Sequence, residues 1–172
     1  MSTAANKRKE TPPSPLGTRH EDDLYTWTVE QMALLRSREL NKIDTDNIIA
    51  ELLFVGKDLL RRLHSSIAVL TMHLLKWDYQ PEKRSRSWVL TVREQRRRIE
   101  RLLRDNPSLR SKAVEGYEAG YADGRNRAID DMAVPEGMLP LASPYVFEEI
   151  MTRAIELDLP EPSQKPKRRN PK

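Results

Sequence analysis

One long stretch of the sequence, residues 45–79, constrains the fold more than any other. It contains no proline, and apolar residues recur in it at steps of three and four positions: Ile48, Leu52, Val55, Leu59, Leu63, Ile67, Leu70, Leu74 and Trp77. This spacing places all of them on one face of an α-helix. The segment 68–75 is apolar on almost every side, which is typical of a helix enclosed by neighbours. We therefore expect one long central helix that forms the centre of the fold.

Four further helices are predicted around it, and no segment has a convincing strand pattern. Helices are expected over 22–40, with Asp22 or Asp23 as N-cap, and over 86–105. The pair Asn106-Pro107 is typical of a cap followed by proline at the first helical position, and Ser143-Pro144 repeats it before a helix over 145–157. Asp44 is a plausible cap for the central helix. The fold class is therefore all-α, a single helical bundle of about five helices.

Composition separates this domain from its two ends. Seven of the twelve prolines lie in the first fifteen or the last thirteen residues, and both ends are polar and rich in lysine and arginine. We expect disordered basic tails over 1–21 and 160–172, flanking a helical domain over 22–159. There is no cysteine, no apolar run long enough to span a membrane and no apolar signal region. These features predict a cytoplasmic protein without disulfides.

Charge is strongly segregated along the chain. Residues 83–110 contain ten basic and three acidic residues, whereas 113–158 contain three basic and ten acidic ones. Five arginines of the helix over 86–105 fall within an arc of about 80°, and we call them the arginine stripe: Arg86, Arg93, Arg97, Arg101 and Arg104. Three interpretations remain open: the stripe pairs with carboxylates or is simply solvated, it binds phosphate groups of nucleic acid, or it binds an acidic protein.

Three glycines recur every fourth residue in the helix that follows. Gly116, Gly120 and Gly124 share one face, and Ala128 continues it. Each glycine costs a helix about 1 kcal/mol relative to alanine, so a compensating gain is expected. Close packing of a neighbouring helix against this glycine ridge is the main prediction, and a frayed loop is the alternative.

A cluster of aromatic and basic residues lies at the end of the long helix. Such a junction can lock the turn between two core helices, or it can form a binding surface, since aromatic residues beside arginine are typical interface anchors. Together with the arginine stripe it forms the candidate interaction surface; the members contributed by the junction are His73, Trp77, Tyr79, Arg84 and Trp88.

Catalytic and metal-binding patterns are missing from the sequence. His64 and His73 are nine positions apart, which places them on opposite sides of a helix, and His73 is expected to be a hydrogen-bonded, partly buried residue. The sequence has no nucleophile elbow, no P-loop and no dinucleotide-binding fingerprint. We therefore predict no catalytic residue, metal or cofactor, and no small-molecule substrate is evident.

Several segments resemble the signature of a bacterial family, domain of unknown function 29. They are Leu24-Tyr25-x-Trp27, Glu30-Gln31, Leu34-Leu35-Arg36, the run from His73 to Pro81, Arg84-Ser85-x-Ser87-Trp88, the run from Arg93 to Arg96, and Pro107-Ser108-Leu109. The resemblance covers about residues 22–159. It implies a small all-helical bacterial protein and supplies no catalytic residues. Where family members carry an acidic stretch, this chain reads Ile48-Ile49-Ala50-Glu51-Leu52-Leu53-Phe54, which suggests a self-association or partner face.

The sequence as a whole favours a non-enzymatic helical interaction module that binds a protein partner or a second copy of itself. The alternative is a nucleic-acid-linked regulatory or antitoxin-like protein that uses the arginine stripe.

Overall fold

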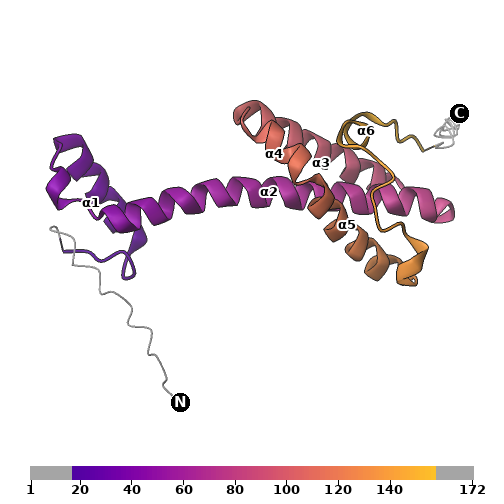
Figure 1. Ribbon diagram of the computed structural model, residues 1–172, viewed down its shortest axis with the longest axis horizontal. Coiled ribbons are helices and arrows are strands. Elements are labelled where there is room, and N and C mark those ends of the chain that lie inside the picture. Colours follow the sequence, from indigo (N-terminus) through magenta and orange to yellow (C-terminus); the bar gives the residue numbers. More distant parts are fainter. Residues whose placement is uncertain (1–16, 158–172) are drawn as a thin grey trace, which may run out of the picture. The chain divides into compact units, whose positions relative to one another are not determined.

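The computed structural model describes residues 17–157, and within that range the chain is helical with no strand (Figure 1). The all-α prediction is confirmed. The helices are α1 (Leu24–Ser37), α2 (Thr45–Tyr79), α3 (Arg86–Asp105), α4 (Leu109–Glu115), α5 (Tyr117–Met132) and α6 (Phe147–Thr152), with single 3₁₀ turns at Leu40–Lys42, Pro81–Lys83 and Glu136–Met138. Most of the two predicted tails lies outside the described residues.

The chain divides into two compact units, the first ending at Lys57 and the second beginning at Asp58, so α2 contributes to both. The predicted apolar face of α2 is buried only in its second half: Leu52 and Val55 are 67% and 56% exposed, whereas Leu63 and Ile67 are fully buried. The first half of this face is therefore exposed.

The second unit contains the main hydrophobic core. Its centre is the second half of α2, around which the other helices of this unit are arranged (Figure 1). Apolar side chains of α3, α4, α5 and α6 join those of α2 in the core. The largest fully buried members are Leu63, Ile67, Leu70, Leu74, Leu75, Val92, Ile99, Tyr121, Leu139 and Ile150. The prediction that this half of the long helix forms the centre of the fold is confirmed.

The glycine ridge packs directly against α2. A Cβ atom added at Gly120 would lie 2.7 Å from Cγ2 of Ile67, and one added at Gly124 would lie 2.6 Å from the carbonyl oxygen of Ala68. Both distances are too short for real atoms, so the two helices approach this closely only because these side chains are absent. Close packing is confirmed and the frayed loop is excluded for this segment.

Several predicted helix ends are displaced. The fourth predicted helix breaks at Gly116, which separates α4 from α5. Asn106 ends α3 instead of starting α4, because its side chain donates to the carbonyl oxygen of Leu102 over 3.2 Å. Ser143 does not cap α6; its hydroxyl accepts from the backbone N–H of Tyr145 over 3.1 Å and turns the chain earlier. The cap-proline signals thus mark turns, at positions shifted from the helix starts.

The first unit is small and is built from α1 and the start of α2. Its two predicted N-caps are confirmed: Asp23 accepts from the backbone N–H of Thr26 over 3.0 Å, and Asp44 accepts from that of Asn47 over 3.3 Å. Trp27 is one of the few buried apolar residues of this unit. Polar contacts therefore provide much of its organisation.

Candidate functional site

The aromatic and basic junction locks the end of α2 to α3. Trp77 is only 5% exposed, and the guanidinium of Arg84 lies 4.9 Å from its ring centre while donating to its carbonyl oxygen over 2.9 Å. The ammonium of Lys76 lies 4.5 Å from the ring centre of Trp88. Trp77 is therefore a core residue, and its assignment to an interaction surface is corrected. Cation–π contacts hold the turn instead.

His73 and Tyr79 are half-buried residues of α2. The Nδ1 of His73 donates to the carbonyl oxygen of Val69 over 2.9 Å. Burial lowers the pKa of His73, and the nearby Lys76 lowers it further, although the bond to Val69 acts in the opposite direction. The imidazole is therefore neutral near pH 7. It is the hydrogen-bonded, partly buried histidine that its position predicted.

The arginine stripe faces solvent along its whole length: Arg86, Arg93, Arg97, Arg101 and Arg104 are all exposed. Arg97 pairs with Glu94 over 2.9 Å and Arg104 with Asp105 over 3.2 Å. The other three form no ion pair within residues 17–157. Local pairing therefore accounts for only part of the stripe.

Sequence reasoning missed an ion-pair network that joins α2 to the end of the described chain. Asp78 accepts from Arg153 over 2.7 Å and from the hydroxyl of Tyr145 over 2.5 Å. Burial alone would raise the pKa of Asp78, but the hydrogen bonds from Arg153 and Tyr145 outweigh it and the net pKa is lowered. No signal in the sequence connects residues separated by 67 and 75 positions.

Buried polar side chains of α5 hold the loop that follows it. The buried Arg125 donates to the carbonyl oxygens of Leu139 and Glu136. The hydroxyl of Tyr117 bonds Ser143 over 2.7 Å, and burial raises the pKa of Tyr117 to about 12. These contacts fix the loop without forming a reactive centre.

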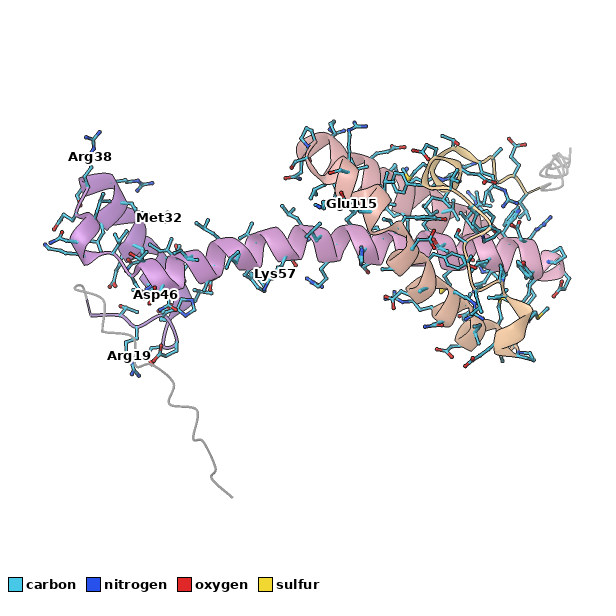
Figure 2. All side chains as sticks on the ribbon, viewed as in Figure 1. Arg19, Met32, Arg38, Asp46, Lys57 and Glu115 are labelled. Carbon is cyan, nitrogen blue, oxygen red and sulfur yellow. The ribbon has the colours of Figure 1, made fainter. Side chains whose placement is uncertain are left out.

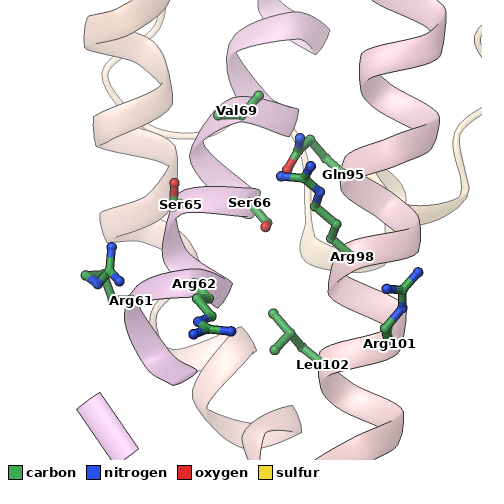
Figure 3. A pocket seen from close by; sticks show the side chains of 9 residues that line it. All are labelled: Arg61, Arg62, Ser65, Ser66, Val69, Gln95, Arg98, Arg101 and Leu102. Carbon is green, nitrogen blue, oxygen red and sulfur yellow. The ribbon is translucent and has the colours of Figure 1, made fainter. Parts of the chain in front are cut away.

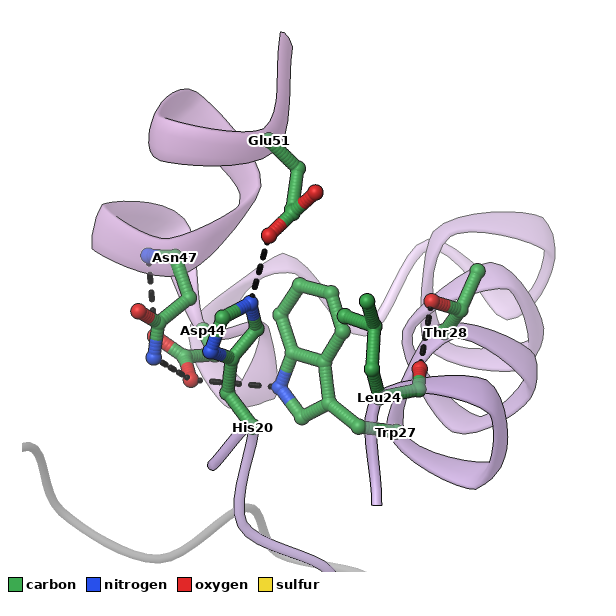
Figure 4. A network of polar contacts seen from close by, with 7 residues as sticks. All are labelled: His20, Leu24, Trp27, Thr28, Asp44, Asn47 and Glu51. Atoms are coloured by element: carbon green, nitrogen blue, oxygen red, sulfur yellow. Dashed lines mark hydrogen bonds and ion pairs between the residues drawn. The ribbon is translucent and has the colours of Figure 1, made fainter. Parts of the chain in front are cut away.

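In the first unit, a polar network surrounds Trp27 (Figure 4). Its indole N–H donates to Asp44 over 3.2 Å, and the ring of His20 packs edge-on against it at 4.8 Å between centres. His20 also bonds Glu51 over 2.7 Å. His20 was assigned to the tail from sequence, so the ordered part of the chain begins before Asp22.

Apolar side chains remain on the outside of the first unit. On α2, Ile49, Leu52 and Leu53 are each at least half exposed. Beside them, α1 and α2 enclose an open groove of about 330 Å³ with mainly apolar walls, formed by Leu24, Met32, Leu35, Ile48, Leu52 and Val55. Contiguous apolar surface of this kind is typical of protein interaction sites.

The described part of the chain has no metal-binding cluster and no membrane-spanning helix. No group of three or more histidine, aspartate and glutamate side chains there is placed to hold a metal ion. None of the helices in residues 17–157 combines the length and the apolar character that crossing a membrane requires.

Comparison with known proteins identifies the family of this chain. The family model described as "Domain of unknown function DUF29" matches residues 20–155, well over half of the chain. Comparisons with curated proteins and with solved structures each give no significant match.

Proposed function

We propose that the chain, which belongs to the family of domain of unknown function DUF29, is a non-enzymatic interaction module of the bacterial cytoplasm that binds a second copy of itself. The observation that carries the proposal is the exposed apolar surface of α2 in the first unit. Ile49, Leu52 and Leu53 each expose at least half of their surface. Burying them against another chain would be favourable in proportion to the apolar area removed from water.

These side chains form an apolar stripe on α2 that also contains a glycine. At about 100° per residue, Ile49, Leu52, Leu53 and Gly56 share an arc of about 100°. A Cβ added at Gly56 would meet nothing within 4 Å, so no packing inside the chain explains this glycine. Glycine inside a helix costs about 1 kcal/mol relative to alanine. A second helix that approaches closely at Gly56 would compensate for that loss.

The stripe is complementary to itself in an antiparallel arrangement. With a two-fold axis at the level between Leu52 and Leu53, the two leucines of one copy face those of the other. Ile49 and Gly56 lie equally far from this level on either side. The large side chain of Ile49 therefore meets Gly56 of the second copy, where space is available. Such matching of the same patch on both subunits is what a two-fold interface requires.

Charge supports the same register. Asp46 and Lys57 lie on the same flank of the stripe, about 20° apart around the helix axis, and both are exposed (Figure 2). In the antiparallel pair, Asp46 of one copy lies about 3 Å along the axis from Lys57 of the other, at a rise of about 1.5 Å per residue. Two such pairs form per dimer, so opposite charges meet at both ends of the stripe.

A single substitution tests self-association. Leu53→Glu places a carboxylate at the centre of the stripe in both copies, and it should weaken self-association at least about tenfold. The matched control is Leu141→Glu, because Leu141 is more exposed than Leu53 and lies in the second unit. The measurement is light scattering over a series of concentrations, with circular dichroism to verify folding. A wild-type chain that is monomeric at every concentration would refute the proposal.

Nucleic-acid binding is a second candidate function, favoured by the exposed arginine stripe. Arg86, Arg93 and Arg101 have no ion-pair partner within the described residues and are free to meet phosphates. Binding of this kind weakens steeply with salt. A filter-binding titration at two salt concentrations tests it, and the absence of binding at about 50 mM salt would eliminate this candidate.

A further inference from the structure

A basic pocket lies between α2 and α3 in the second unit (Figure 3). Its volume is about 370 Å³, which lies in the range of small-molecule sites. Four arginines line it: Arg61 and Arg62 come from α2, and Arg98 and Arg101 come from α3. The two helices thus bring together positive charges that are far apart in the sequence.

The positive charge of this pocket is only partly neutralised. Asp58 pairs with both Arg61 and Arg62, and Glu94 pairs with Arg98 over 2.9 Å. Neither carboxylate lines the pocket. The four guanidiniums carry four positive charges and the two carboxylates carry two negative charges, so the net charge at the pocket is positive. Each guanidinium has five N–H donors, so these ion pairs leave further donors for a ligand.

Two polar side chains that form no hydrogen bond within the described residues lie in the same place. Gln95 and Ser66 line the pocket and are only 8% and 7% exposed. Neither side chain forms a hydrogen bond with any described residue, and Figure 3 shows both pointing into the space between the helices. The polar atoms of these two side chains are not enclosed by protein, so they are accessible from the open space of the pocket. Donors left unused beside a cluster of arginines therefore point to a ligand rich in acceptor oxygens.

We propose that this pocket binds a phosphorylated small molecule. The phosphoryl group lies between Arg62 and Arg98 and accepts from the amide of Gln95 and the hydroxyl of Ser66. The rest of the molecule contacts Leu102 and Val69, the apolar lining residues. Arginine suits this role because its planar fork donates two parallel bonds to phosphate oxygens. This site is separate from the self-association surface and does not depend on it.

Calorimetric titration of the full chain with phenyl phosphate tests the site, since this probe joins a phosphoryl group to a small apolar ring. We expect binding by phenyl phosphate, weaker binding by inorganic phosphate and none by phenol. Arg62→Gln and Arg98→Gln should each weaken phenyl phosphate binding at least about tenfold, since each removes a charge-assisted contact. Arg86→Gln, an exposed arginine of α3 outside the pocket, should leave it unchanged.

Gln95→Leu separates a ligand-binding role from a structural one. The amide of Gln95 has no hydrogen-bond partner in the described chain, and leucine is of similar size, so the melting temperature of the ligand-free chain should change little. The increase in melting temperature that phenyl phosphate produces in the wild type should be lost. A large loss of ligand-free stability would instead assign Gln95 to the core and contradict the proposal.

Three results would overturn the small-molecule site. The first is no heat of binding by phenyl phosphate in the wild type. The second is equal binding by Arg62→Gln, Arg98→Gln and the wild type, which would place the probe elsewhere. The third is binding of a short single-stranded oligonucleotide that these two variants abolish, while phenyl phosphate does not bind. That result would assign the pocket to nucleic acid.

Discussion

At the scale of single residues, Gly124 determines how closely α5 approaches α2. The nearest atom to an added Cβ is a backbone oxygen, that of Ala68, and the Cβ of Thr71 is 2.9 Å away. A flexible side chain could move aside, whereas the backbone of a buried helix cannot do so without shifting its neighbours. The glycine is therefore required by a contact and not by an unusual backbone angle.

Gly124→Ala should consequently destabilise the second unit. We expect the free energy of unfolding to fall by about 1 to 3 kcal/mol, the usual effect of overpacking a core. Chemical denaturation monitored by circular dichroism measures this change. Gly137→Ala is the control, because a Cβ there meets nothing within 4 Å. Equal stability of both variants would show that the two helices are not packed at the described distance.

Asp78 contacts two residues of the second unit that lie 67 and 75 positions away in the sequence. Its hydrogen bonds with Arg153 and Tyr145 lower its pKa in the folded chain. A lowered pKa stabilises the fold at every pH above the unfolded value, about 3.9. The contribution is lost as the pH falls from there through the folded pKa. The wild type should therefore lose stability in acid.

Asp78→Asn tests this contribution. At pH 7 we expect a loss of about 2 kcal/mol in the free energy of unfolding, since three hydrogen bonds to a charged acceptor are weakened. The difference from the wild type should narrow as the pH is lowered below about 4. Denaturation at a series of pH values measures both effects. Glu94→Gln also removes a carboxylate that pairs with arginine, but this pair is on the surface, and stability should hardly change.

At the scale of elements, hydrophobic periodicity predicted the helices well but not their burial. The repeat from Ile48 to Trp77 correctly predicted α2, and the glycine spacing correctly predicted a tightly packed α5. Periodicity shows that side chains share a face, yet it does not show whether another element covers that face. Leu52 and Val55 belong to the repeat and share its face, yet both side chains are exposed.

The contacts that sequence reasoning missed all join distant segments. Asp78 pairs with Arg153, and the basic pocket takes Arg62 from one helix and Arg98 from another. Each of these residues looks like an ordinary charged surface position within its own helix. Only the packing of the helices brings them together. Local patterns carry no information about such pairs, whereas caps such as Asp44 depend on adjacent residues and were predicted correctly.

Asp44 connects the two helices of the first unit, and its removal should loosen the start of α2. It caps Asn47 and also accepts from the indole of Trp27. Asp44→Ala should cost about 1 to 2 kcal/mol of local stability. Hydrogen exchange at the backbone N–H of Asn47 should accelerate, while Asn41→Ala, at an exposed position, should not affect it. Unchanged exchange in Asp44→Ala would contradict the described cap.

At the scale of the whole molecule, the two units differ in how many apolar side chains they bury. The second unit holds the main core and the basic pocket. The first unit buries few apolar residues and leaves Ile49, Leu52 and Leu53 exposed. A second copy of the chain would cover a surface of this composition.

Site-specific cross-linking is a direct test of self-association through α2, because the chain has no cysteine of its own. We would prepare Asp46→Cys and Lys57→Cys separately and treat each, and their mixture, with a short bis-maleimide reagent. In the antiparallel pair, Asp46 of one copy lies near Lys57 of the other. Like positions are separated along the axis by about 20 Å for residue 46 and about 14 Å for residue 57, at a rise of about 1.5 Å per residue.

An antiparallel dimer should give a covalent product in the mixture and little in either variant alone. Cross-linking of each variant to itself, with none between the two, would indicate a parallel pair, and no dimer in any sample would contradict self-association through α2.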